Sequence, residues 1–264
     1  MDILTRIVEH KKKEIAAAER LVPESGLRGK SLQIQNKRSF WKKLVAPDHT
    51  GVNIIAEIKR ASPSKGIIRA DLDAARQAEA YEQGGAAAIS VLTDRHFFSG
   101  SPTDLINARQ ATTLPVLRKD FLISSYQIFE SAALGADAVL LIVRILSKSQ
   151  LHDYLALCRE LNMDALVEIH CRKDLDTAMH SGAHLIGINN RNLTSFETDT
   201  RTAATLAGQL GPDQVAVAAS GICDRRDIKT GLKAGIYNFL IGESLVRAPD
   251  PITMLQALKT NEHK

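Results

Sequence analysis

Two residues of opposite charge, Glu57 and Lys59, end an apolar stretch rich in β-branched residues that begins at Val52. The stretch predicts a buried strand, and because side chains alternate along a strand, both charges leave it on the same face. Residues 62–66, Ser-Pro-Ser-Lys-Gly, then end the strand with turn-forming residues. Since burying either ion without a partner is costly, the pair indicates a polar cavity or, alternatively, a mutual salt bridge with no further role.

The charged pair ends the first of eight strand-like segments, and an amphipathic helical stretch follows each of them. The expected strands are 52–58, 86–92, 115–118, 137–143, 164–169, 184–188, 214–219 and 237–241. The expected helices are about 71–83, 102–111, 124–134, 147–161, 171–181, 198–209, 223–233 and 251–259. This order predicts a (βα)8 TIM barrel of the α/β class. An open doubly wound sheet would usually carry a glycine-rich dinucleotide fingerprint, and none follows residue 58.

The residues before the first strand predict a helical extension. Apolar residues recur with helical spacing from Ile3 until Pro23 ends the pattern. The basic run 10–13 on this helix is interpreted as a solvated face. A polar stretch then connects to a shorter helix around 39–45. We expect a single domain, residues 1–264, with an extension at 1–50 and a barrel at 51–260.

Composition narrows the functional class. Hydrophobic residues make up 44% and charged residues 24%, as in an ordinary globular protein. The formal charge of +4 is mild and spread along the chain, so we expect no nucleic-acid partner. No apolar run reaches the roughly 18 residues of a membrane span, and Met1-Asp2 begins no signal peptide, so we expect no membrane association. The odd number of cysteines, Cys158, Cys171 and Cys223, indicates reduced thiols in a cytoplasmic protein. We also expect a monomer or weak homo-oligomer, with no second enzyme fused after the eighth helix.

Polar residues converge at the carboxyl ends of the expected strands, where TIM barrels place their active sites. The rim brings together two lysines, two glutamates and an asparagine: Lys59, Lys119, Glu57, Glu168 and Asn189. A lysine held near another cation can act as a general acid or form a Schiff base. A carboxylate across from it can serve as a base or stabilise a developing cation. The rim therefore indicates catalysis.

Small residues lead into helices after the seventh and eighth strands, at 220–222 (Ser-Gly-Ile) and 242–244 (Gly-Glu-Ser). Free backbone N–H groups at these positions would form the phosphate site typical of this fold. No His, Cys or Asp cluster has the spacing of metal ligands, so we expect no metal ion and no cofactor.

Six motifs, in order along the barrel, resemble those of the indole-3-glycerol phosphate synthase family. They are Ala-Glu-Ile-Lys-Arg-Ala-Ser-Pro-Ser at 56–64, Ser-Val-Leu-Thr-Asp at 90–94, Leu-Arg-Lys-Asp-Phe at 117–121, Ala-Val-Leu-Leu-Ile at 138–142, Gly-Ile-Asn-Asn-Arg-Asn-Leu at 187–193 and Ser-Gly-Ile at 220–222. The resemblance spans about residues 1–260, extension included. It implies a small anionic substrate that carries a carboxylate and a phosphate.

The implied reaction closes the ring of 1-(2-carboxyphenylamino)-1-deoxyribulose 5-phosphate with loss of CO2 and water. By this resemblance, Lys119 is the general acid that protonates the substrate carbonyl, and Glu168 stabilises the cationic intermediate and takes part in proton transfers. Lys59 binds the substrate carboxylate and shares in acid catalysis during dehydration, with Glu57 and Asn189 positioning the groups around it.

The resemblance also implies a set of binding residues. The phosphate ligands would be Ser220, Gly221, Gly242 and Glu243, the last two through backbone N–H groups, with Ser62 close by. Arg191 would lie near Asn189 at the rim, and Phe98 and Leu193 would wall the aromatic pocket.

One position departs from the family pattern. The family usually has Glu-Ser-Gly at the end of the seventh strand, and this chain has Ala219-Ser220-Gly221. The missing carboxylate leaves three alternatives: an active synthase, another sugar-phosphate barrel enzyme such as an isomerase or epimerase, and a catalytically weakened or ligand-binding paralogue. The combination of Lys59 and Lys119 favours the synthase.

Overall fold

Eight parallel strands close into a ring in the computed structural model, which describes residues 2–34, 36–191 and 197–260. The strands are β1 (Asn53–Ile58), β4 (Ala88–Leu92), β5 (Val116–Lys119), β6 (Ala138–Ile142), β7 (Asp164–Ile169), β8 (Leu185–Asn189), β9 (Val215–Ala219) and β10 (Asn238–Ile241). Each pairs with its neighbours in chain order, and β1 closes the ring by pairing with both β4 and β10. The predicted (βα)8 barrel is confirmed.

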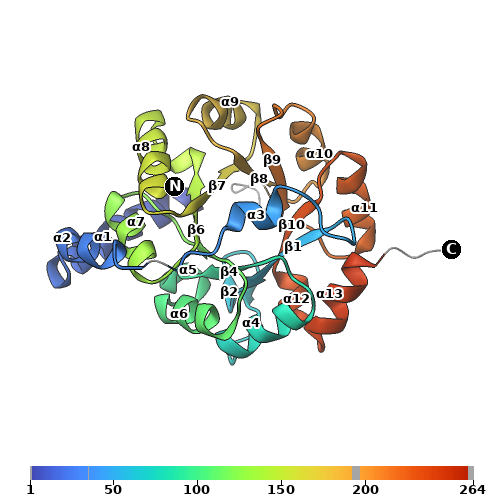
Figure 1. Cartoon of the computed structure of the whole chain (residues 1–264), viewed down its shortest axis with the longest axis horizontal. Helices are drawn as coiled ribbons and strands as arrows, with labels where there is room; N and C mark the ends of the chain where they lie inside the picture. Colours follow the sequence, from blue (N-terminus) through green and yellow to red (C-terminus); the bar gives the residue numbers. More distant parts are fainter. Residues whose placement is uncertain (1, 35, 192–196, 261–264) are drawn as a thin grey trace.

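Helices surround the ring of strands (Figure 1). The main ones are α4 (Ala74–Gln83), α6 (Pro102–Ala111), α7 (Ser125–Ala133), α8 (Lys148–Glu160), α9 (Arg172–His180), α10 (Arg201–Ala207), α11 (Arg225–Lys233) and α13 (Pro251–Lys259). Further short elements lie in the loops that follow strands: the hairpin β2 (Ala61–Ser62) and β3 (Gly66–Ile67), α5 (Arg95–Phe98), the 3-10 helix η1 (Val143–Ile145) and α12 (Glu243–Arg247). They are too short to leave a hydrophobic period in the sequence.

Side chains of each strand alternate between two packing layers. Ile55 and Leu117 join an apolar cluster inside the ring, whereas Ile54 joins the larger cluster between strands and helices. Glu57 and Lys119 stand two positions beyond Ile55 and Leu117, so the same alternation turns both charged side chains inward at the carboxyl end of the ring.

The N-terminal extension forms α1 (Ile3–Leu21), α2 (Glu24–Ser31) and α3 (Phe40–Leu44). Phe40 and Leu44 are fully buried in the cluster inside the ring, and α3 lies across the centre of the barrel in Figure 1. The backbone N–H of Trp41 donates to Asp164 Oδ2 over 2.8 Å, which fixes α3 at the amino end of β7. Helix α3 therefore closes the end of the barrel opposite the charged rim.

Helix α2 stands where the sequence indicated only a polar connection. Gly26 and Gly29 each disfavour a helix by about 1 kcal/mol. Leu27 is buried and α2 packs on α7. Tertiary packing here outweighs the local propensity.

Candidate active site

A cavity of about 450 Å3 opens at the carboxyl ends of the barrel strands. Every predicted site residue that the structure describes lines it: Glu57, Lys59, Ser62, Phe98, Lys119, Glu168, Asn189, Arg191, Ser220, Gly221, Gly242 and Glu243. Leu193 lies outside the described residues. The strand ends thus bring together side chains that are far apart in the sequence.

Glu57 lies between two ammonium groups at the centre of this rim. Its Oε1 is 2.6 Å from Lys59 Nζ and its Oε2 is 3.4 Å from Lys119 Nζ. Burial alone would raise the pKa of Glu57, but the two lysines outweigh it and lower that pKa to about 2. Burial likewise favours a lower pKa for Lys119, yet the carboxylates of Glu57 and Glu168 raise it. The site therefore holds an ionised carboxylate and a protonated lysine in contact.

Glu168 and Asn189 form the opposite side of the rim. Asn189 Nδ2 donates to Glu168 Oε1 over 3.2 Å, and Asn189 Oδ1 accepts from the backbone N–H of Arg191 at 3.0 Å. The Arg191 guanidinium reaches across the mouth to Ser64 Oγ at 2.6 Å. These contacts orient the Glu168 carboxylate toward the cavity that Lys119 shares.

Gly242 lies directly under the Glu57–Lys59 ion pair. A Cβ atom at this position would collide with Glu57 Oε1 and lie 3.0 Å from Lys59 Nζ. A side chain at this position would force the ends of Glu57 and Lys59 to move from their observed places. Gly242 therefore shapes the charged centre as well as the entry to α12.

Backbone conformation is special at the turn after β9. Ser220 and Gly221 have φ values of 70° and 75°, and a Cβ at Gly221 would collide with Thr198 Cγ2. Asn190 Nδ2 donates to the Ser220 carbonyl over 3.0 Å and supports the turn.

The first N–H groups of α12 have no intrahelical acceptor. The Glu243 carboxylate is held by Arg247 Nε at 3.1 Å.

Ala219 is the residue that stands where the Glu of the Glu-Ser-Gly motif was expected. It lines the cavity, is 4% exposed, and is paired in register with Asn189 of β8. A longer side chain at this position would enter the cavity beside the groups on Asn189 and Glu168.

One wall of the cavity is apolar and includes residues that sequence reasoning did not assign. Phe98 packs against Phe121 with ring centroids 5.9 Å apart. Leu140 and Ile142 of β6 contribute from inside the ring. The first two turns of α1 add a roof of three side chains, Ile3, Leu4 and Ile7. In the sequence, the spacing of these three residues predicts only an apolar helix face. The local pattern does not tell whether such a face covers a cavity or packs in the core.

Lys11 fastens α1 to the rim. Its Nζ is 2.9 Å from Asp94 Oδ2, 3.0 Å from Asp120 Oδ1 and 2.7 Å from Glu14 Oε2. Lys11 is 4% exposed, so the interpretation of residues 10–13 as a solvated face is wrong for this lysine. Asp94 caps α5, which carries Phe98, and Asp120 follows Lys119 in the chain. The anchor of α1 is therefore adjacent to two predicted site residues.

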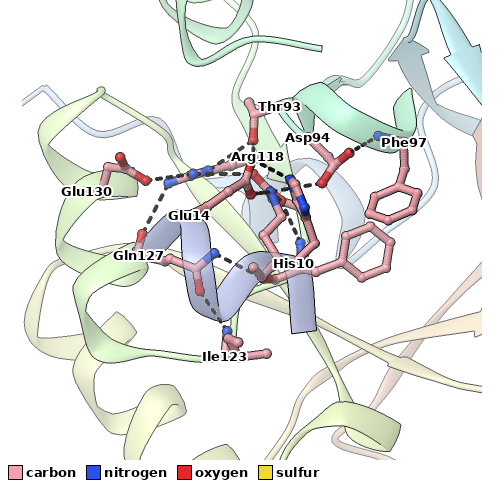
Figure 2. Close-up of polar contacts among 12 residues, drawn as sticks. His10, Glu14, Thr93, Asp94, Phe97, Arg118, Ile123, Gln127 and Glu130 are labelled. Atoms are coloured by element: carbon pink, nitrogen blue, oxygen red, sulfur yellow. Dashed lines mark hydrogen bonds and ion pairs between the residues drawn. The ribbon is translucent and has the colours of Figure 1, made fainter. Parts of the chain in front are cut away.

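Arg118 supports the same anchor from the outer layer of β5. Figure 2 shows Arg118 between Thr93 and Glu130, with Asp94 bonded to Phe97 nearby. Its Nη2 lies 2.7 Å from Glu130 Oε2 and 3.3 Å from Asp120 Oδ2. Burial opposes the ionised form of Asp120, but Arg118 and Lys11 lower the Asp120 pKa below its usual range. The buried charges are thus paired with one another.

The family comparison covers nearly the whole chain. A family model described as indole-3-glycerol phosphate synthase matches residues 4–258. The chain is 57% identical over 260 residues to an indole-3-glycerol phosphate synthase of Desulfosudis oleivorans, covering 98% of this chain and 99% of that protein. It is 52% identical to one of Syntrophobacter fumaroxidans, over 97% of each chain, and 47% identical to one of Legionella pneumophila, over 98% and 99%.

Solved structures agree on the fold. Thiamine phosphate pyrophosphorylase from Pyrococcus furiosus superimposes with a TM-score of 0.58 at 16% identity, covering 80% of this chain and 94% of that one. At such low identity this similarity supports the barrel alone.

Proposed function

This chain belongs to the indole-3-glycerol phosphate synthase family, and from that premise we propose that its cavity closes the indole ring of 1-(2-carboxyphenylamino)-1-deoxyribulose 5-phosphate as a carboxy-lyase. One observation carries the proposal at the level of residues: Lys59 and Lys119 share the Glu57 carboxylate and lie in one cavity with Glu168. A substrate with a carboxylate, a phosphate and an aromatic ring requires cations, N–H donors and an apolar wall, and this cavity has all three.

Ring closure needs an acid at the substrate carbonyl. Lys119 fits this role because its raised pKa keeps the ammonium protonated at neutral pH, with Glu57 holding it in place. As the aromatic carbon bearing the carboxylate attacks the carbonyl carbon, the carbonyl oxygen takes the Lys119 proton. The aniline nitrogen then becomes a cationic iminium, and the Glu168 carboxylate stabilises that charge.

Decarboxylation and dehydration complete the reaction. Lys59 holds the carboxylate until CO2 leaves and its electron pair restores the aromatic ring. The new hydroxyl then leaves as water after taking a second proton, from Lys59 or Lys119, and Glu168 accepts the C–H proton that is lost. Two protons enter and one leaves, so each turnover takes up one proton from solvent.

The phosphate and the ring bind at opposite sides of the cavity in this proposal. Ser220, Gly221, Gly242 and Glu243 would bind the phosphate chiefly through backbone N–H groups at the two turns. Ser62 also lines this cavity, and its Oγ has no hydrogen-bond partner within the described residues. Phe98 and Leu193 would contact the aromatic ring, and Arg191 would lie at the rim near Asn189.

Indole fluorescence tests the proposal directly. Purified protein mixed with the substrate should produce indole-3-glycerol phosphate, and Lys119→Met should lower kcat by about 100-fold or more, as loss of a general acid does. Lys43→Met, an exposed lysine of α3, is the matched control and should keep full activity. Binding of the substrate without product would favour the ligand-binding alternative that Ala219 raises.

We also propose a cytoplasmic monomer or weak homo-oligomer. Cys158, Cys171 and Cys223 are free thiols, which suits a reducing compartment. Across residues 2–34, 36–191 and 197–260, none of the helices is long and apolar enough to cross a membrane.

A further inference from the structure

Asn190 is a buried residue to which the proposed reaction gives no role. It follows β8 directly and is 4% exposed. Asn189 lines the main cavity, and because side chains alternate along an extended chain, Asn190 faces the opposite side, where its amide contacts Ala203 of α10. Asn190 can therefore act on a ligand in the cavity only through its neighbours.

Hydrogen bonds to backbone groups hold Asn190 in place. Its backbone N–H donates to the Ala219 carbonyl at 2.9 Å, and its Nδ2 donates to the Ser220 carbonyl at 3.0 Å. Its Oδ1 accepts from the Ala203 N–H at 2.9 Å, and its carbonyl accepts from the Asp199 N–H at 3.0 Å. Because one atom of the side-chain amide meets an acceptor and the other a donor, the orientation of the amide is fixed. Asn190 thus joins the end of β9 to the first turn of α10.

The bond to the Ser220 carbonyl fixes the peptide unit between Ser220 and Gly221. In a trans peptide the carbonyl oxygen and the following N–H point in opposite directions. The Ser220 carbonyl points to Asn190, so the Gly221 N–H points to the other side, where Gly221 lines the main cavity. Within the described residues, this N–H donates to no backbone carbonyl. The peptide therefore presents its donor to the cavity and its acceptor to Asn190.

The turn at these two residues needs an outside restraint. Ser220 has a φ of 70°, in the left-handed region that non-glycine residues rarely occupy, and such a conformation persists only where the surroundings support it. Gly221 has a φ of 75°. Glycine adopts positive and negative φ about equally readily, so on that side the peptide has little intrinsic resistance to rotation. The hydrogen bond from Asn190 supplies that resistance.

We propose that Asn190 is a positioning residue that aims the Gly221 N–H at the substrate phosphate. This inference rests on the proposed function, in which that N–H is one of the phosphate ligands. Asn190 holds the Ser220 carbonyl away from the cavity. If the peptide rotated, the carbonyl oxygen would turn toward the phosphate, and repulsion would replace the attraction between an N–H group and an anion. Affinity for the phosphate therefore depends on a residue that does not contact it.

Asn190→Asp tests this role with little change of shape. The carboxylate keeps an oxygen for the Ala203 N–H but places its second oxygen, instead of the Nδ2 donor, against the Ser220 carbonyl. Repulsion between the two oxygens favours the rotated peptide. Near pH 8, the inhibition constant of inorganic phosphate and the KM of the substrate should therefore both rise about tenfold or more. Inhibition by 2-aminobenzoate, which carries the ring and carboxylate of the substrate but no phosphate, should stay within about twofold of wild type, and kcat within about threefold.

Two further variants complete the experiment. Asn190→Ala removes the donor without adding a charge, so it gives the same test if the Asp variant does not fold or stays protonated; its phosphate inhibition constant should rise about threefold to tenfold. Asn53→Asp is the matched control. Asn53 is also buried, donates from Nδ2 to the Ala46 carbonyl at 2.9 Å and accepts from the Asp48 N–H at 3.1 Å. It begins β1, at the end of the barrel opposite the cavity, so its replacement should lower stability and leave inhibition by phosphate unchanged.

The outcomes separate this role from a purely structural one and from the proposed function. Equal weakening of inorganic phosphate and 2-aminobenzoate in the Asn190 variants would overturn the positioning role, because the change would then disturb the whole site. Unchanged inhibition by phosphate in Asn190→Ala would overturn it as well. Wild-type protein that forms product but is not inhibited by phosphate would refute the phosphate position at Gly221 and the role of Asn190. Absence of product from wild-type protein would refute the proposed function itself.

Discussion

Replacing Lys11 with Met should detach α1 from the active-site rim. The thioether side chain keeps helix propensity and most of the buried volume, so the change removes chiefly the ammonium group. Asp94 then loses its counter-ion, while Asp120 keeps Arg118 and Thr93. The buried Asp94 carboxylate is therefore the source of the destabilisation.

The magnitude follows from the burial of these groups. Lys11, Asp94 and Asp120 side chains are 5%, 0% and 2% exposed, and breaking such a buried pair costs about 3–5 kcal/mol. Because Asp120 remains paired, we expect the lower end, about 3 kcal/mol, which makes the undocked state of α1 about 100-fold more populated. The melting temperature should fall by about 6 °C or more for a chain of this size. KM should rise because Ile3, Leu4 and Ile7 no longer cover the cavity.

Lys12→Met provides the matched control for this experiment. Lys12 is the next residue on α1 and pairs with Glu9 at 2.7 Å, but both side chains are more than half exposed, so the change should alter stability by less than about 1 kcal/mol. Denaturant unfolding and steady-state kinetics of both variants give the comparison. Adding Asp94→Asn to Lys11→Met should recover part of the loss, since it removes the unpaired charge. If the Lys11 and Lys12 variants unfold at the same denaturant concentration with the same KM, the proposed anchor is refuted.

Three further changes test the charged centre. Gly242→Ala should lower kcat/KM by about tenfold or more because the new Cβ displaces the Glu57–Lys59 pair; Gly29→Ala, whose Cβ meets no atom within 4 Å, should have no effect in the same assay. Because its pKa in the folded state is lowered, ionised Glu57 stabilises the fold above its unfolded pKa of about 4.3, and this stabilisation is lost as the pH falls toward 2. Over this pH range, the free energy of unfolding should therefore change by about 3 kcal/mol less in Glu57→Gln than in wild type. Ala219→Glu should raise KM, because the cavity gains a negative charge that repels the anionic substrate, and should raise kcat by adding a proton acceptor; unchanged steady-state constants would show that this position does not face the reacting groups.

The barrel could be predicted from the sequence because strand alternation and strand–helix order are local patterns. The apolar run at 52–58 and its charged end were enough to predict that Glu57 and Lys59 share a face, and the ion pair between them confirms it. The expected mutual salt bridge and the expected cavity turned out to be one arrangement, since the pair lines the cavity.

Contacts between distant segments could not be predicted in this way. The spacing of Lys11 marks a helix face, but its burial depends on two carboxylates, Asp94 and Asp120, that lie more than 80 positions away. The same limit applies to His170, which stands at a strand end like its neighbours on the rim. Only the structure shows that its imidazole is buried beside Glu168, with Nε2 3.5 Å from Glu168 Oε1.

The closure of the barrel floor by α3 has a consequence for synthesis on the ribosome. The Leu44 carbonyl accepts from Asn238 Nδ2, a residue 194 positions later, and Tyr237 donates its hydroxyl proton to the Val45 carbonyl. At about 5–20 residues per second, α3 emerges roughly 10–40 s before those partners exist. Helix α3 therefore lacks these contacts on the nascent chain until β10 is made, so a segment that is translated early is among the last to be completed and protected from proteases.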